Sequence, residues 1–273
     1  MQIDAFLISS IKRRLHQRKN KQVHFTLEDK NYIIKLAETS EEVDAALRLR
    51  FEVFNLEMKE GLESSYATMR DEDMYDKQFD HLLIIDKASQ KIIGTYRMQT
   101  YEMAKKGIGF YSNGEFCLDM LPKHIISESI ELGRACIDKN FRNTRVLFLL
   151  WRGIANYIHL SKKRYLFGCC SLTSQEPLEG LSLLKQLREG NQVDTTFKMT
   201  ARPGYELDNI ENLDSLAVQV EMPPLLGMYL RYGAKIIGDP AIDREFKTID
   251  YLILLDVSLF DQNTFRLFLG KQE

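Results

Sequence analysis

The chain has 273 residues, of which 44% are hydrophobic and 28% are charged, and its formal net charge at pH 7 is −2. This composition is typical of a globular enzyme and excludes a disordered, collagen-like or coiled-coil chain. The length allows one or two domains with a sizeable core, and the nearly balanced charge gives no indication of nucleic acid as a partner.

The spacing of the cysteines and the lengths of the apolar segments indicate the cellular compartment of the protein. Cys117, Cys136, Cys169 and Cys170 show neither a CxxC spacing nor a Cys/His ligand pattern. We therefore expect reduced thiols, no metal site and a cytoplasmic protein. No segment approaches the roughly 18 consecutive apolar residues that span a bilayer, and the N-terminus lacks the order of charged and apolar regions of a secretory signal.

Residues 1–30 form a basic arm by composition, and residues 31–273 form the main domain. Within the arm, apolar residues at positions 5, 6, 7 and 11 are followed by six lysines and arginines between positions 12 and 21. This pattern predicts a short basic amphipathic helix that docks on lipid head groups or on an acidic carrier protein, which would give a peripheral contact with the inner membrane. A solvated or packed terminus is the alternative.

The first part of the main domain alternates strand and helix signals. We predict a strand over 32–36, a helix over 40–54 with Ser40 as its N-cap, and an acidic loop over 63–80. Two apolar segments, 81–86 and 92–100, flank a polar turn and predict an antiparallel hairpin.

A strand over 129–137, a long apolar helix over 145–160 and a strand over 165–171 come next. Such a βαβ unit makes its two strands neighbours in one sheet. Beyond it, we predict mixed helix and loop over 177–215, a helix over 223–233 that ends at Gly233, and strands over 234–238 and 248–256. The predicted fold is a mixed α/β sheet with helices on its faces.

This order of elements resembles the GNAT acyltransferase fold. Eight separated segments also occur in the order found in the OlsB-type, or hemolysin-like, N-acyltransferases: ALRLRFEVFNLE, DMYDKQFDHLLIID, IIGTYRM, FYSNGEF, ELGRACIDKNFR, LLWRGIANYI, YLFGCCS and PPLLGMYLRYGAKIIGDPAIDREFKTIDYLILLDV. The resemblance covers about residues 31–260 and extends, more distantly, to the acyl-homoserine-lactone synthases. It implies a GNAT-like domain in which the central strands 129–137 and 165–171 splay apart.

The resemblance also implies a reaction. A fatty acyl chain, expected to carry a 3-hydroxyl group, would move to the α-amine of an amino acid, either ornithine or glycine, in the first step of amino-acid-containing lipid synthesis. The donor would be the phosphopantetheine thioester of acyl carrier protein, and no cofactor would be bound permanently.

The reaction needs a group that removes a proton from the amine and a donor for the developing oxyanion. In a splayed pair of strands, a carboxylate on the first strand lies near the acyl carbon, so Glu131 is the predicted general base, directly or through a water. Arg134 on the same strand is grouped with it as a catalytic residue. The alternative role for Glu131 is an ion pair with Arg97 or Arg134.

The predicted donor site differs from that of CoA-dependent relatives. The segment Arg142-Asn-Thr-Arg-Val-Leu has no glycine, so side chains crowd the backbone cradle that would hold a pyrophosphate. The single phosphate of a carrier-bound pantetheine would be held by Arg142, by Arg145 or by the helix N-terminus. Ile137, Cys169 and Ser171 are expected to face the pantetheine arm.

The predicted acceptor site combines acids and arginines. Asp73 and Asp76 precede the strand 81–86 and would attract the ammonium of the acceptor. Arg97 and Arg134 would either pair with these acids or bind the acceptor carboxylate in a bidentate manner. Arg50 and Phe51 resemble residues of the family's acceptor-side helix, with core packing and an ion pair as the alternative.

The acyl chain would need an apolar tunnel, for which the candidates are Leu149, Leu150, Trp151, Phe167 and the helix over 223–232. Two other functions remain open at this level: a CoA-dependent GNAT acetyltransferase acting on a small amine, and a hemolysin-like membrane-active protein.

Overall fold

The computed structural model describes residues 23–269, so the greater part of the predicted basic arm lies outside the described residues. The strands are β1 (Thr26–Glu28), β2 (Tyr32–Leu36), β3 (Asp80–Asp86), β4 (Ile92–Thr100), β5 (Ser129–Ile137), β6 (Tyr165–Leu172), β7 (Val193–Asp194), β8 (Lys235–Ile237), β9 (Ala241–Asp243) and β10 (Thr248–Asp256).

The helices are α2 (Ser40–Phe51), α3 (Ser65–Thr68), α4 (Tyr101–Lys106), α5 (Lys123–Ser127), α6 (Thr144–Ser161), α7 (Pro177–Glu189), α8 (Leu213–Leu216), α9 (Pro224–Arg231) and α10 (Gln262–Leu269). A π-helical segment, η1 (Glu52–Glu57), continues α2, and the 3-10 segments are η2 (Tyr111–Gly114), η3 (Leu118–Met120) and η4 (Val257–Leu259). Within residues 23–269, none of these helices combines the length and the apolar character that a bilayer crossing requires.

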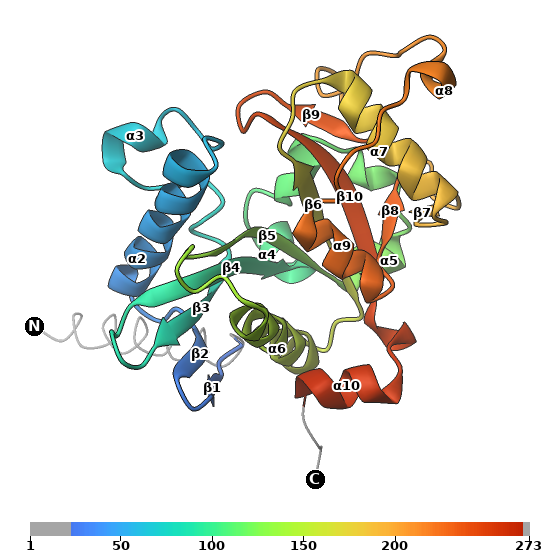
Figure 1. Ribbon diagram of the computed structural model, residues 1–273. Coiled ribbons are helices and arrows are strands. Elements are labelled where there is room, and N and C mark those ends of the chain that lie inside the picture. Colours follow the sequence, from blue (N-terminus) through green and yellow to red (C-terminus); the bar gives the residue numbers. More distant parts are fainter. Residues whose placement is uncertain (1–22, 270–273) are drawn as a thin grey trace, which may run out of the picture.

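All strands belong to one mixed sheet in the order β1-β2-β3-β4-β5-β6-β10-β8-β7, with β9 on the side of β10 (Figure 1). The predicted hairpin is confirmed, because β3 and β4 pair antiparallel. The predicted βαβ unit is also confirmed, because β5 and β6 are parallel neighbours joined by α6. β1 adds to the edge of the sheet, so the last residues of the predicted arm belong to the fold.

The central pair of strands separates soon after it begins. β5 and β6 pair only over Ser129↔Tyr165, Ile130↔Leu166 and Glu131↔Phe167, although β5 continues to residue 137 and β6 to residue 172. β6 instead pairs with β10 along its whole length, and β5 pairs with β4. The predicted splay of the two strands is therefore present.

Helices cover both faces of the sheet, with α6 and α2 on opposite sides of β3–β5 (Figure 1). The main core joins α6, α7, α9 and one sheet face, and it includes the residues Leu149, Leu150 and Trp151 that were candidates for the tunnel. Phe167 lies in a second core on the opposite side of the sheet. These four side chains are core residues, because the apolar periodicity of α6 and β6 reflects packing against the sheet.

Local capping determines where the main helices begin. Thr39, one residue before the predicted cap, accepts a hydrogen bond from the backbone N–H of Glu42 and is the N-cap of α2. Asn143 caps α6 by accepting hydrogen bonds from the backbone N–H groups of Arg145 and Val146 at 3.0 and 3.1 Å. Such a cap satisfies donors that the first helical turn leaves without partners.

Candidate active site

A cavity of about 490 Å³ lies where β5 and β6 separate. Its walls come from both strands, from the segment that leads into α9, from η1 and its following loop, and from the turn between β9 and β10. The lining residues are Phe54, Met58, Glu60, Tyr96, Arg97, Tyr111, Leu132, Gly133, Arg134, Ala135, Cys169, Cys170, Ser171, Leu172, Thr173, Glu221, Met222, Pro223, Pro224, Leu225, Leu226, Asp243, Phe246, Thr248 and Asp250.

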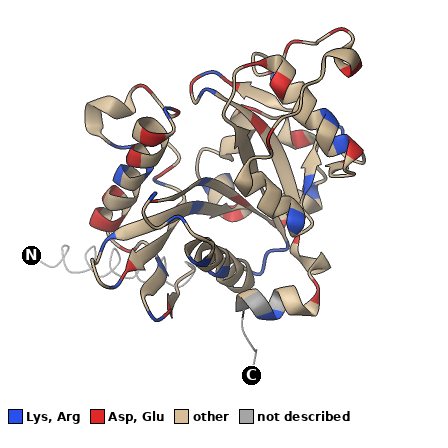
Figure 2. Cartoon of the chain, viewed as in Figure 1, with Lys and Arg blue, Asp and Glu red and all other residues tan. Residues whose placement is uncertain are grey.

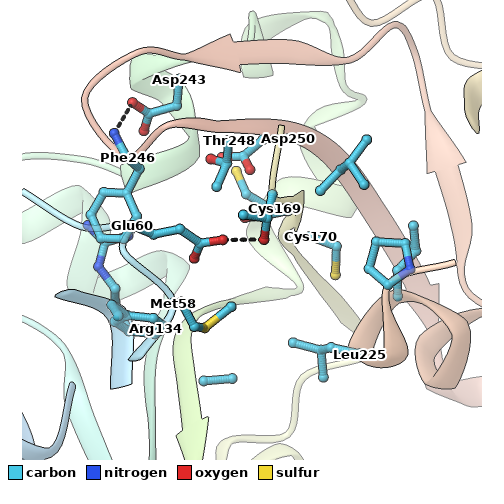
Figure 3. Close-up of a pocket in the computed structure, with 18 of the residues that line it drawn as sticks. Met58, Glu60, Arg134, Cys169, Cys170, Leu225, Asp243, Phe246, Thr248 and Asp250 are labelled. Carbon is cyan, nitrogen blue, oxygen red and sulfur yellow. Dashed lines mark hydrogen bonds between the residues drawn. The ribbon is translucent and has the colours of Figure 1, made fainter. Parts of the chain in front are cut away.

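The cavity has a charged side and an apolar side. Figure 3 shows Glu60, Asp243 and Asp250 on the side away from Leu225. The segment Met222–Leu226 supplies the apolar wall. A molecule with a polar head and a long hydrocarbon chain matches this division, because each part would contact groups of its own polarity.

A network of three arginines and three aspartates lies behind the charged side. Arg50 is fully buried and donates to Asp71 and Asp76, in each case at 2.6 Å. Arg97 holds both oxygens of Asp73 at 2.8 Å and Asp76 at 3.0 Å. The arginines hold the pKa values of Asp71 and Asp76 below their usual range despite burial. Arginines therefore compensate the buried carboxylates Asp71 and Asp76 within the network.

Arg134 connects this network to the cavity. Its guanidinium lies 3.5 Å from Asp71 and 3.5 Å from Asp73, and it stacks on the ring of Phe246 at 3.8 Å. Its Nε has no hydrogen-bond partner within the described residues. The residue also has a left-handed backbone, with φ of 55°, at an irregularity in the pairing of β4 and β5. A side chain in such a rare conformation is held there by its surroundings.

The carboxylate of Glu131 is hydrogen-bonded to groups outside the arginine–aspartate network. Its carboxylate accepts hydrogen bonds from the Gln99 amide at 2.7 Å and from the backbone N–H groups of Tyr111 and Ser112 at 3.0 and 2.7 Å. It is 1% exposed, and it is not among the residues that line the cavity. Its partners are thus an amide and a loop backbone, and not the arginines of the alternative prediction. This placement gives Glu131 a role in holding the loop at 111–112.

The carboxylates inside the cavity have only neutral partners. Glu60 accepts a hydrogen bond from the Thr173 hydroxyl, and burial together with the nearby Asp250 raises the pKa of its carboxyl. Asp243 accepts from the backbone N–H groups of Glu245 and Phe246, both at 2.8 Å. Burial also raises the pKa of Asp250. The charged side of the cavity is therefore acidic and poorly compensated.

The sequence of the chain is similar to those of known transferases. Residues 49–152 match the family model of the acetyltransferase (GNAT) domain. The chain is 32% identical over 238 residues to the L-ornithine N(alpha)-acyltransferase of Rhizobium meliloti (strain 1021), covering 83% of this chain and 80% of that protein. It is 33% identical over 237 residues to the enzyme of the same name from Brucella abortus (strain 2308), covering 82% of this chain and 84% of that protein.

The chain belongs to the L-ornithine N(alpha)-acyltransferase family. It is an acyltransferase with the GNAT fold, so the predicted family and fold class are confirmed. Among solved structures it is similar to the AHL synthase LasI, with 12% identity, a TM-score of 0.47 and coverage of 90% of this chain and 100% of that chain. Family membership implies an amino-acid acceptor and an acyl donor.

In this acyltransferase, the predicted site residues fall into two groups. The cavity is lined by Arg97, Arg134, Cys169 and Ser171. The predicted residues that do not line the cavity are Arg50, Phe51, Asp73, Asp76, Glu131, Ile137, Arg142 and Arg145. Phe51 packs edge-on against Tyr66 at 5.4 Å, and the neighbouring Phe54 is the aromatic residue of this helix that reaches the cavity.

The two arginines predicted to hold the donor phosphate have carboxylate partners in the acyltransferase. Arg142 forms a bidentate pair with Glu57 at 2.6 and 3.0 Å and also donates to the backbone carbonyl of Ile137 at 3.0 Å. Arg145 pairs with Asp29. Both arginines are near half exposed, so a phosphate would have to compete with carboxylates in water. Their role as phosphate ligands stays a prediction.

The two thiols that line the cavity of the acyltransferase are poor nucleophiles. Cys169 donates toward Ser112 and Glu115 at 3.5 and 3.7 Å. Burial raises the pKa of Cys169 well above its usual range, and burial raises that of Cys170. A buried thiol that stays protonated does not attack a thioester, because the thiolate is the reactive form.

Sequence reasoning missed the acidic residues of the cavity. Asp250 interrupts the otherwise apolar strand Thr248–Asp256, and this position of an acid in a buried strand is a signal that the sequence contains. Asp71, an acid of the network behind the cavity, lies two residues before Asp73, outside the segment DMYDKQFDHLLIID that resembles the family. Glu60 lies in a loop with no local pattern.

Proposed function

We propose that the enzyme transfers a long acyl chain from the thioester of acyl carrier protein to the α-amine of L-ornithine. The observation that carries this proposal is the cavity between β5 and β6, which has an acidic side and an apolar side. The acceptor is taken from the relatives, which are named for ornithine. The product would be a single-chain N-acyl amino acid, an intermediate of lipid synthesis.

The charge distribution supports an orientation for the acceptor. Arg134 lines the cavity, its ion pairs with Asp71 and Asp73 are long at 3.5 Å, and a carboxylate is the natural partner of a guanidinium. The acceptor carboxylate would therefore lie against Arg134 and the ring of Phe246 beneath it. The apolar wall around Leu225 would receive the acyl chain.

The start of α6 supports a carrier protein over CoA as the donor. The side chain of Asn143 already occupies the first backbone N–H groups of this helix, which is where a pyrophosphate would bind. Among the cations on and around α6, Arg142, Arg145, Lys163 and Arg164 form ion pairs within the protein. Lysines, arginines and acids are also interspersed along α2 and α7 (Figure 2). A carrier would therefore dock through a few cations, including Arg152 and Lys162.

Within this proposal, Glu60 replaces Glu131 as the general base. Glu60 lies in the cavity, is 6% exposed and has a raised pKa, which brings the carboxyl closer to the pKa range suited to proton abstraction near neutral pH. The α-ammonium gives one proton to Glu60 and attacks the thioester carbonyl carbon. The new C–N bond forms, the C–S bond breaks, and the second amine proton goes to the departing thiolate.

The proposed setting is cytoplasmic, because the four cysteines are free thiols and the donor is a cytoplasmic carrier protein. A peripheral membrane contact through the arm is part of the proposal. The residues 1–22 that would make it lie outside the described residues.

The decisive experiment supplies the purified enzyme with one 3-hydroxyacyl chain in two forms, on acyl carrier protein and on CoA, together with L-ornithine. We expect mass spectrometry to detect N-acyl-ornithine, with a kcat/KM at least tenfold higher for the carrier-bound donor. Equal or faster use of acyl-CoA would overturn the choice of donor. Failure to acylate ornithine with either donor would overturn the proposed function, and lysis by the protein without donor would favour a membrane-active role.

A further inference from the structure

We propose that Asp250 and Thr248 bind the side-chain ammonium of a diamino-acid acceptor and so select it over neutral amino acids. This inference rests on the proposed function, which it deepens by assigning acceptor selectivity to particular residues. The two residues lie on β10 and line the acidic side of the cavity (Figure 3).

The side chain of Asp250 lies near those of Ser171, Glu115 and Thr248. The first support is that one oxygen atom in each of Asp250 and Thr248 still has no regular hydrogen bond. Asp250 is 4% exposed and Thr248 is 1% exposed, yet Asp250 Oδ1 and Thr248 Oγ1 have no hydrogen bond of regular geometry within the described residues. Leaving a buried polar atom without a partner costs about 1–3 kcal/mol. These two groups lie two residues apart on β10, both residues line the cavity, and each oxygen can accept a hydrogen bond from a ligand that provides donors.

The second support is the sign of the charge. Glu60 and Asp243 accept their hydrogen bonds from neutral groups, and Asp250 adds a further acid to the same wall. Burial and the adjacent Asp250 hold the pKa of Glu115, a further acid next to Asp250, well above its usual range. The wall therefore favours a cation, because buried charges in proteins are paired or neutralised.

An alkylammonium group fits this wall chemically. Its three N–H donors match the carboxylate oxygen of Asp250 and the hydroxyl oxygen of Thr248, with one donor left for a further acceptor. Arg134, on the wall of the same cavity, would bind the acceptor carboxylate at the other end of the molecule. A diamino acid has an anionic group at one end and a cationic group at the other, and it would satisfy both ends at once.

A neutral amino acid would bind poorly for a physical reason. A methyl group placed against Asp250 would leave the carboxylate buried and unpaired, and sites built around a buried polar partner reject such analogues strongly, by about 10⁴-fold in well-formed cases. L-Norvaline is the informative competitor, since it has the carbon skeleton of L-ornithine without the side-chain amine.

The test compares the kcat/KM values of L-ornithine and L-norvaline with one acyl carrier protein donor. The wild-type enzyme should prefer ornithine at least 100-fold. In Asp250→Asn, which keeps the shape and removes the charge, kcat/KM for ornithine should fall at least 100-fold, while that for norvaline should rise, because no buried carboxylate is then left unpaired. Asp214→Asn, at an acid that is 94% exposed, is the matched control and should keep the wild-type ratio.

A second variant tests the inference independently, in case Asp250→Asn does not fold. Thr248→Val removes the hydroxyl at constant shape and should lower the ornithine-to-norvaline ratio about tenfold, with an unchanged thermal midpoint. An unchanged ratio in both folded variants would overturn the inference while leaving the proposed function intact. A wild-type enzyme that acylates neither amino acid would instead contradict the proposed function, so the two failures are distinguishable.

Discussion

Gly168 on β6 lies so close to the backbone carbonyl oxygen of Leu132 on β5 that a Cβ atom at this glycine would overlap that oxygen. The contact occurs one residue beyond the last paired position, Glu131↔Phe167. The absence of a side chain at residue 168 thus allows the two strands to stay close at the base of the cavity before they separate.

We predict that Gly168→Ala pushes these strands apart. Overpacking at such a contact costs about 1–3 kcal/mol of unfolding free energy, measurable by urea denaturation. The KM for the acyl donor should also rise, because the wall beside Leu132 moves. Gly114→Ala is the control, since a Cβ atom there meets nothing within 4 Å, and it should change stability by less than about 0.5 kcal/mol. A Gly168→Ala enzyme with unchanged stability and KM would refute the role of this contact.

The second prediction concerns Glu60 as the base. In the wild type, log kcat/KM should rise with pH through the pKa of Glu60, because the carboxyl must ionise before it can accept a proton. Burial and the nearby Asp250 raise this pKa above the usual value of 4.5. Glu60→Gln should lower kcat by about 10²–10⁴-fold and remove this limb of the profile. Glu63→Gln, at an exposed acid three residues away, is the matched control and should behave as the wild type. A Glu60→Gln enzyme with near-normal kcat would exclude the proposed base.

The central unit of the fold was predictable from the sequence because its signals are local. The predicted strand over 129–137 coincides with β5, and α6 differs from the predicted helix by one residue at each end. Apolar residues recur at many positions of such a long segment, so a few exceptions do not obscure the strand or helix pattern. The short helices α4 and α5 span six and five residues and were missed, since they contain too few turns for a period.

The site was only partly predictable, because its partners are distant in sequence. Glu60 contacts Thr173 across 113 residues, and Arg145 meets Asp29 across 116 residues. A motif identifies the type of residue and its element, as it did for Arg97 and Arg134, but the competition between carboxylates and ligands for an arginine is decided by tertiary packing. The pair of Arg50 and Asp76 at 2.6 Å corresponds to the ion pair that was the alternative for Arg50, and a role of either residue at the acceptor stays a prediction.

The third prediction tests the buried ion-pair network through Arg50→Met. This change leaves Asp71 and Asp76 without their shared partner in a buried site. Removing one member of a buried pair costs about 3–5 kcal/mol of unfolding free energy, which urea denaturation at pH 7 would measure. Arg48→Met is the control, because Arg48 pairs with Asp44 at the surface, and it should cost less than about 1 kcal/mol. A loss of less than about 1 kcal/mol in Arg50→Met would contradict the importance of this network.

The same network predicts a dependence of stability on pH. The folded-state pKa values of Asp71 and Asp76 lie below their unfolded values, so the stability that they contribute is present above the unfolded pKa of about 3.8 and is lost as pH falls toward the folded values. The wild type should therefore lose stability between about pH 5 and pH 3. In Arg50→Met the loss over this range should be smaller, because protonation then relieves uncompensated buried charge. Equal slopes for both proteins would refute this account.

The last prediction separates a positioning role for Glu131 from a catalytic one. Its two carboxylate oxygens accept three hydrogen bonds, two of them from the backbone of Tyr111 and Ser112. Glu131→Gln replaces one oxygen by an NH2 group, which then faces a donor and leaves it unsatisfied. We expect a loss of about 1–3 kcal/mol in unfolding free energy, faster amide exchange at residues 111–112, and a lower kcat with the pH profile unchanged. Glu128→Gln, at an exposed position, is the control. If Glu131→Gln instead abolished the rising limb of the pH profile while stability and amide exchange stayed as in the wild type, Glu131 would be the base and Glu60 would not.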